Sequence, residues 1–206
     1  MDHQPRSVYE TVLGDSIGLL SPGLADYVQR PPHGFEGFGT GTYEVAGSRR
    51  RWLRPVLAYL SWRRILFPEY GTAVPFTTTN SPVPGGLDAV RTFQFAGRTR
   101  LMEDSMRVVD GRLHDFLGRR RGLECELLLS VAEGRMLMSS RRLWLHVGPL
   151  RLRIPRLASI SLVEQSVSDG QHVSVVLSSP GLGDWFEYRG TFTYAYRPRQ
   201  DRTSSG

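Results

Sequence analysis

The sequence lacks lysine altogether, has one cysteine and contains no long hydrophobic run. All 26 basic residues are therefore arginine, a bias that suggests a GC-rich genome. Cys125, being alone, excludes an intramolecular disulfide and any multi-cysteine metal site, and its place in an alternating apolar run predicts a buried small hydrophobe. No stretch approaches the roughly 20 apolar residues that span a bilayer, and the chain begins with polar residues. These absences predict a cytoplasmic protein with no integral membrane segment.

Motifs for the common cofactors and catalytic groups are also missing. The five histidines show none of the spacings typical of metal ligands. Gly37, Gly39 and Gly41 do not form a dinucleotide fingerprint, because the spacing is wrong and a strand-like segment follows them. The sequence contains no nucleophile elbow and no phosphate loop. We therefore expect neither a metal nor a cofactor.

The net charge of +6 is compatible with a nucleic acid or an anionic membrane as partner. The arginines, however, are scattered among strand-like segments and turns, with local clusters only at residues 49–51 and 119–121. No recognised nucleic-acid module accompanies the charge. The sequence therefore predicts no nucleic-acid partner.

Alternating apolar and polar residues dominate the chain after residue 72. Turn signals such as Asp110-Gly111, Glu133-Gly134 and Asp169-Gly170 separate the runs. The predicted strands span residues 35–46, 73–79, 88–96, 101–109, 112–117, 123–131, 135–147, 158–167, 172–179 and 185–196. So many strands in series are expected to curl, because closure removes exposed edges. The predicted fold class is mainly β, an antiparallel meander that closes into a β-barrel or a strongly curved sheet with a ligand cavity.

Two segments instead show helical spacing. Residues 7–29 are expected to form one or two short helices, with Ser7 and Glu10 as a capping box. Residues 52–66 are expected to form a helix that flanks the barrel, with Pro55 in its first turn. The length favours a single domain over residues 1–206, with disordered tails at 1–6 and 197–206.

Several short segments together resemble a bacterial family catalogued as domain of unknown function 4166. They include the GTGTYEV strand, LFPEYGTAVPF (66–76), AVRTFQF (89–95), LHDFLG (113–118) and SPGLGDWFEYRGTF (179–192). Members occur alone or fused to saccharopine-dehydrogenase-like domains. They tend to carry Trp where this chain has Ala89, and the smaller residue is expected to widen a pocket. The resemblance implies a fold more than a function.

Candidate site residues come from the faces of the predicted strands, because side chains alternate along a strand. Arg91, Phe93 and Phe95 share one face. Arg91 is interpreted either as a surface arginine that lies over the sheet or as an inward group that holds a ligand oxygen.

A second face, on residues 135–147, carries Met136, Met138, Arg142, Trp144 and His146. This face offers adaptable apolar contacts, stacking and one group that titrates near neutral pH. The alternative is that the opposite face, with Leu137, Leu143, Leu145 and Val147, forms the core.

Glu164 lies among Ile160 and Leu162, an unusual place for a carboxylate unless it is paired or used in acid–base chemistry. The predicted catalytic residues are Arg91, Glu164 and Tyr188. The remaining predicted substrate contacts are Met102, Asp104, Met106, Phe186 and Tyr194.

The functional hypothesis is a small-molecule enzyme of bacterial specialised metabolism, a cofactor-free cyclase or isomerase that folds a hydrophobic, polyketide-like substrate. In architecture alone it resembles the small β-barrel cyclases of polyketide pathways. The alternatives are a non-catalytic carrier of a hydrophobic ligand, or an accessory domain of an oxidoreductase system. Peripheral membrane association through residues 49–66 is a third interpretation. Homodimer formation is left open.

Overall fold

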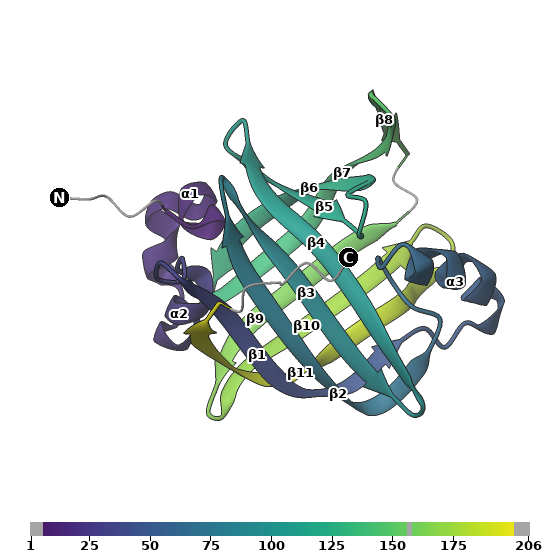
Figure 1. The fold of residues 1–206 in the computed structure, drawn as a ribbon, viewed down its shortest axis with the longest axis horizontal. Helices are drawn as coiled ribbons and strands as arrows, with labels where there is room; N and C mark the ends of the chain where they lie inside the picture. The colour runs from purple at the N-terminus through teal and green to yellow at the C-terminus, as the bar shows by residue number, and fades with distance from the viewer. Residues whose placement is uncertain (1–5, 156–157, 200–206) are drawn as a thin grey trace.

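A computed structural model describes residues 6–155 and 158–199. In this part of the chain, eleven strands form a single antiparallel sheet (Figure 1). The strands are β1 (Phe35–Gly47), β2 (Tyr70–Val83), β3 (Gly86–Phe95), β4 (Arg98–Val109), β5 (Arg112–Leu117), β6 (Leu123–Ala132), β7 (Arg135–Val147), β8 (Leu150–Ile154), β9 (Ser159–Val167), β10 (Gly170–Ser179) and β11 (Gly183–Pro198).

The sheet closes into a ten-stranded barrel. Its order is β6-β5-β4-β3-β2-β1-β11-β10-β9-β7, and β7 also pairs with β6 to complete the ring. The arrangement is a meander in which β8 alone lies outside the ring, so that β7 pairs with β9, and the pairing of β1 with β11 joins the first strand to the last of the described strands. Each wall strand therefore has one face toward the barrel interior and one face outside. The expected antiparallel barrel is confirmed.

Tight turns join the strands where the sequence predicted them. Asp110 and Gly111 have φ of 49° and 71°, and Glu133 and Gly134 have φ of 51° and 74°. Positive φ at both central residues is what a two-residue hairpin with the right-handed twist of a sheet requires. These turns fix the register of β4 on β5 and of β6 on β7.

Strand β8 was not predicted. Its alternating LRLRI segment is short and lies between Pro149 and Pro155, and this sequence pattern is typical of a loop. It extends the C-terminal half of β7 beyond the barrel wall, and Figure 1 shows it projecting from the barrel. The expected tail is also corrected at its start, because Arg197 and Pro198 belong to β11. Residues 1–5 and 200–206 lie outside the described residues.

Helical segments lie at opposite ends of the barrel (Figure 1). One end carries α1 (Val8–Leu13) and α2 (Ala25–Val28), with two 3₁₀ turns between them at Gly14–Leu19 and Pro22–Leu24. The predicted capping box at Ser7 and Glu10 is confirmed. We call residues 7–28 the helical cap.

The other end carries α3 (Arg54–Trp62), preceded by a 3₁₀ turn at Arg51–Leu53. The helix is shorter than the predicted 52–66, because the backbone turns away at Arg64, where φ is 59°. The chain then directs Phe67, which is fully buried, into the barrel, where its ring packs against Phe93 and Phe186 with centroids 4.6 and 5.0 Å away.

Candidate functional site

A cluster of ionisable side chains lies inside the barrel. Arg91 on β3 donates a hydrogen bond from Nη1 to Oδ1 of Asp104 on β4. Both side chains are shielded, with 16% of Arg91 and 3% of Asp104 exposed. Burial alone would lower the pKa of Arg91, but the Asp104 carboxylate raises it well above its ordinary value. The pair is therefore a charged ion pair in an apolar interior.

Two further carboxyl groups face the same interior. Burial, and then the nearby charge of Asp104, raise the pKa of Asp115 on β5 well above its usual range. Burial likewise raises the pKa of Glu164 on β9 to about 7, against the lowering effects of a hydrogen bond with Tyr27 and of the charge on Arg91. A carboxyl group with a pKa near neutrality can both accept and release a proton under physiological conditions.

Three carboxylate oxygens in this cluster have no hydrogen-bond partner in the described chain: Oδ2 of Asp104, Oδ1 of Asp115 and Oε2 of Glu164. A buried polar atom without a partner costs about 1–3 kcal/mol, so native proteins leave few of them. Their presence together on β4, β5 and β9 indicates a place where a molecule with hydrogen-bond donors, or ordered water, is accommodated.

The helical cap reaches this cluster through two tyrosines. Tyr27 makes the hydrogen bond to Glu164, and the Tyr9 hydroxyl lies 3.5 Å from the sulfur of Met106. The two rings are stacked with centroids 6.2 Å apart. A narrow opening of about 10 Å³ lies beside Tyr9, bounded by residues 29–31 and Leu87, and it has room for about one water molecule. The cap therefore closes this end of the barrel directly over the carboxyl groups.

Aromatic rings line the remainder of the interior. Tyr43 stacks on Phe76 with centroids 3.7 Å apart and on Phe93 at 5.3 Å. Tyr188 meets Tyr43 edge-on at 5.1 Å, and burial raises the pKa of its hydroxyl to about 12. Tyr188 is therefore a neutral hydrogen-bond donor at physiological pH.

Most of the sequence-predicted site residues lie on this interior face. Arg91 is inward, and its partner in the described chain is Asp104. The predicted residues that the barrel brings together are Arg91, Phe93, Phe95, Met102, Asp104, Met106, Met136, Met138, Glu164, Phe186, Tyr188 and Tyr194. Sequence reasoning missed Asp115, Tyr9, Tyr27 and Tyr43. Asp115 alternates with Leu113 and Leu117, a signal that could have placed it inward.

Arg142, Trp144 and His146 do not share the face of the two methionines, which corrects the prediction. The reason is a β-bulge: Leu127 of β6 pairs with Ser140, whereas the preceding Glu126 pairs with Arg142. The extra residue, Arg141, reverses the alternation of β7. Met136 and Met138 therefore point inward and are buried, while the three residues after the bulge point outside.

On the outside Trp144 and His146 join a second carboxylate cluster, whereas Arg142 pairs with Glu126. Glu124 of β6 is 2% exposed, and its carboxylate receives Nε and Nη2 of Arg151 at 2.8 and 2.6 Å. Ring nitrogens of His114 and His146 each lie 2.6 Å from it. Since an ionised carboxylate only accepts, both nitrogens must carry a proton. Burial alone would raise the pKa of Glu124, but these hydrogen bonds lower it to about 2.

Trp144 supports the same cluster. The guanidinium of Arg151 lies 4.1 Å from the centroid of the Trp144 ring, and His114 stacks on that ring at 5.7 Å. The Glu124 carboxylate thus accepts two hydrogen bonds from Arg151 and one each from His114 and His146, and these four bonds use its capacity as an acceptor. We interpret the cluster as a structural clamp that fastens β8 to the barrel wall.

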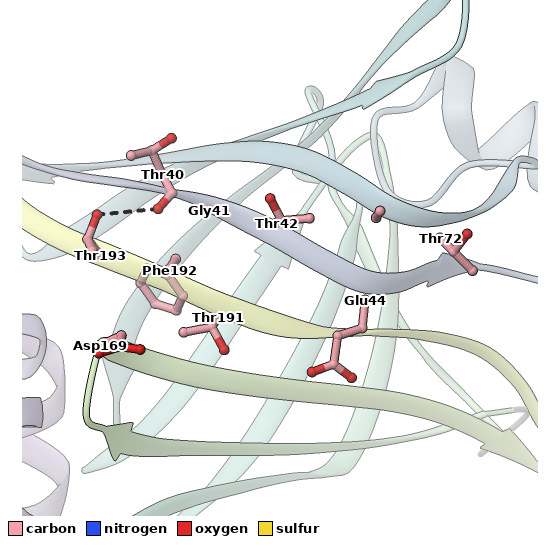
Figure 2. Close-up of a pocket in the computed structure, with 10 residues that line it drawn as sticks. Thr40, Gly41, Thr42, Glu44, Thr72, Asp169, Thr191, Phe192 and Thr193 are labelled. Carbon is pink, nitrogen blue, oxygen red and sulfur yellow. Dashed lines mark hydrogen bonds between the residues drawn. The ribbon is translucent and has the colours of Figure 1, made fainter.

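A surface depression of about 590 Å³ lies on another part of the outer wall. Figure 2 shows that it is lined by side chains of β1, β2 and β11, most of them threonines, with Glu44 and Asp169 at its border. Thr193 donates a hydrogen bond to the carbonyl oxygen of Thr40 at 3.4 Å. It is open and distant from the ionisable cluster, so the barrel interior remains the stronger candidate site.

No group of three or more His, Cys, Asp or Glu side chains in residues 6–155 and 158–199 is placed so that it could hold a metal ion. No helix in the same part of the chain is both long and apolar enough to cross a membrane.

Comparison with known proteins places the chain in a family. The model of the family described as "Domain of unknown function (DUF4166)" matches residues 22–192. An uncharacterized protein of Bacillus subtilis (strain 168), YndH, is 28% identical over 200 residues, which cover 90% of this chain and 96% of that protein. No solved structure matches. The chain belongs to the family of domain of unknown function 4166.

Proposed function

We propose that the barrel interior binds an apolar small molecule that carries hydrogen-bond donors, and that Glu164 exchanges a proton with it in a cofactor-free isomerisation or cyclisation. The observation that carries this proposal is the state of Glu164: it is 3% exposed, its pKa is raised to about 7, and one of its oxygens has no partner in the described chain. A base in a water-poor site needs these properties, because it must be partly ionised at neutral pH and free to accept.

The surroundings support both parts of the proposal. Arg91 uses one guanidinium N–H group for Asp104, so other donors of the same planar group are free to polarise a carbonyl. The rings of Phe93, Tyr43 and Tyr188 provide apolar contact area with defined orientation, and a flexible substrate held against them is restricted to few conformers. A ten-stranded barrel is also wider than the eight-stranded barrels that hold one small ligand.

Proton abstraction can be tested with a probe that needs only a base in an apolar site. In the elimination of nitrobenzisoxazole, the base takes a carbon-bound proton, the N–O bond breaks and a coloured phenolate is released. We expect turnover by the wild-type protein to increase as pH rises through about 7, because only ionised Glu164 is a base. Glu164→Gln should abolish this turnover, and Glu44→Gln, on the outer wall, should retain it.

A non-catalytic carrier is the alternative, and a binding measurement separates it from the enzyme. The neutral fluorescent dye N-phenyl-naphthylamine, which carries one N–H donor, reports binding in an apolar site. Dye binding that is competed by nitrobenzisoxazole, without turnover of the latter, would favour the carrier. If neither compound bound, the interior would be a closed core and both functions would be excluded.

A further inference from the structure

The barrel wall has a seam on its outer side, at the bulge of β7. Before the bulge β7 pairs with β9, from Met136 to Ser139, and after it β7 pairs with β8, from Leu143 to Val147. The chain therefore changes partners around Arg141 and Arg142. A groove of about 400 Å³ lies at this change and is lined by Arg141, Arg142, Leu143, Arg153, Ile154 and Pro155.

The charges of this groove are not balanced. Nη1 of Arg141 and Nη1 of Arg142 lie 3.2 and 3.3 Å from the two oxygens of Glu126, which is 2% exposed. The same carboxylate also meets Arg112 at 3.3 Å. Arg153 forms no ion pair with any residue in the described ranges. Three guanidinium groups thus line the groove against one carboxylate, which leaves at least two positive charges without a counterion among the described residues.

Uncompensated guanidinium groups held close together repel one another and attract anions. The planar fork of arginine matches phosphate and carboxylate oxygens and binds them with strong, charge-assisted hydrogen bonds. A surplus of two positive charges is complementary to a dianion, which favours a phosphate monoester over a carboxylate. Ile154, which is half-buried, and Pro155, which is exposed, provide an apolar floor for an apolar substituent.

We propose that the groove at the seam between β7, β8 and β9 is a binding site for a phosphate monoester with an apolar substituent. Arg141, Arg142 and Arg153 bind the phosphate, and Ile154 and Pro155 contact the substituent. The site lies outside the barrel and does not depend on the function proposed for the interior. The phosphate can come from a soluble ester or from a lipid headgroup, and both sources share this chemistry.

Calorimetric titration of the whole protein with phenyl phosphate tests the site directly. Inorganic phosphate is the second probe, and chloride holds the ionic strength constant. We expect phenyl phosphate to bind more tightly than inorganic phosphate, because only the ester covers the apolar floor. Arg153→Gln should weaken phenyl phosphate binding about tenfold, since it removes one charged group that donates hydrogen bonds to the phosphate.

Arg54→Gln is the matched control. Arg54 is exposed at the start of α3, and the substitution removes the same charge far from the groove in sequence. The control should bind phenyl phosphate like the wild-type protein. Equal weakening by the two variants would indicate nonspecific attraction to a basic protein and would overturn the proposal, as would absence of binding in the wild type.

Flotation with lipid vesicles then distinguishes the two sources. Vesicles that contain phosphatidic acid in phosphatidylcholine should carry the protein if a lipid headgroup is the ligand, and Arg153→Gln should remain unbound. Binding of phenyl phosphate without flotation assigns the site to a soluble ester. Both results support the groove as a phosphate site.

Discussion

Arg91 and Asp104 form a diagonal pair inside the barrel: the residue directly opposite Asp104 on β3 is Ala89, and Arg91 lies one inward position further along. Ala89 is 2% exposed and has only a methyl group. The small residue leaves the space through which the guanidinium reaches the carboxylate. The pair is therefore built from three positions, Arg91, Asp104 and Ala89. All three stood out in the sequence, but no pattern there showed that they meet.

Removal of one partner of this pair is expected to destabilise the fold. Arg91→Met leaves the Asp104 carboxylate buried without a counterion, which costs about 3–5 kcal/mol. The double variant Arg91→Met with Asp104→Leu removes both charges and should be more stable than Arg91→Met alone. Urea unfolding of the three proteins measures this. If Arg91→Met unfolded at the same urea concentration as the wild type, the pair would not be buried in solution.

The pKa of Glu164 predicts a pH dependence of stability. Its pKa is raised from about 4.5 to about 7 on folding, so between these values the unfolded chain has lost a proton that the folded protein retains. Stability from this group is complete below about pH 4.5 and declines as pH rises through about 7, by about 3 kcal/mol in total.

Glu164→Gln removes this dependence because glutamine stays neutral. The variant should match the wild type at about pH 4.5 and exceed its free energy of unfolding above about pH 8. Urea unfolding of both proteins at the two pH values provides the comparison. A constant difference in the free energy of unfolding between the two proteins across this pH range would show that the pKa of Glu164 does not change on folding.

Glu124 predicts the opposite dependence. Its pKa is lowered on folding to about 2, so its stabilising effect is complete above the ordinary pKa of about 4.5 and is lost as pH falls toward about 2. Glu124→Gln cannot form the ion pair with Arg151 and should unfold at a lower urea concentration at neutral pH. The difference from the wild type should shrink below about pH 3, and a difference that stayed constant would contradict the assignment.

Gly190 should not tolerate a side chain. A Cβ atom there would lie 2.2 Å from the carbonyl oxygen of Thr42 and 2.6 Å from the Cα of Tyr43, both in the neighbouring strand β1. Gly190→Ala must displace backbone and is expected to cost about 1–3 kcal/mol. Gly18→Ala is the control, since nothing lies within 4 Å of a Cβ at that exposed position. Thermal unfolding of both variants measures the effect, and equal melting temperatures would contradict the close approach.

The strands, their hairpins and the inward face of β3 could be predicted from the sequence because they follow from local alternation and from Asp-Gly and Glu-Gly turns. The outward placement of Trp144 could not, because it depends on one extra residue, Arg141, which reverses the alternation without any glycine to signal it. The partner of Arg91 could not be predicted either. Asp104 was a candidate, but which strands are neighbours is a property of the closed barrel, and no local pattern shows it.

The pairing of β1 with β11 has a consequence for synthesis. This ladder joins Phe35 to Pro198, so the second edge of β1 stays uncovered during synthesis until β11 has been made. Until then β1 and β10 both have unpaired backbone groups, and such open edges pair readily with other chains. The helical cap precedes β1 and packs on β11. Its contacts with the barrel are therefore completed only after β11 has been made, when the carboxyl groups of the interior become enclosed.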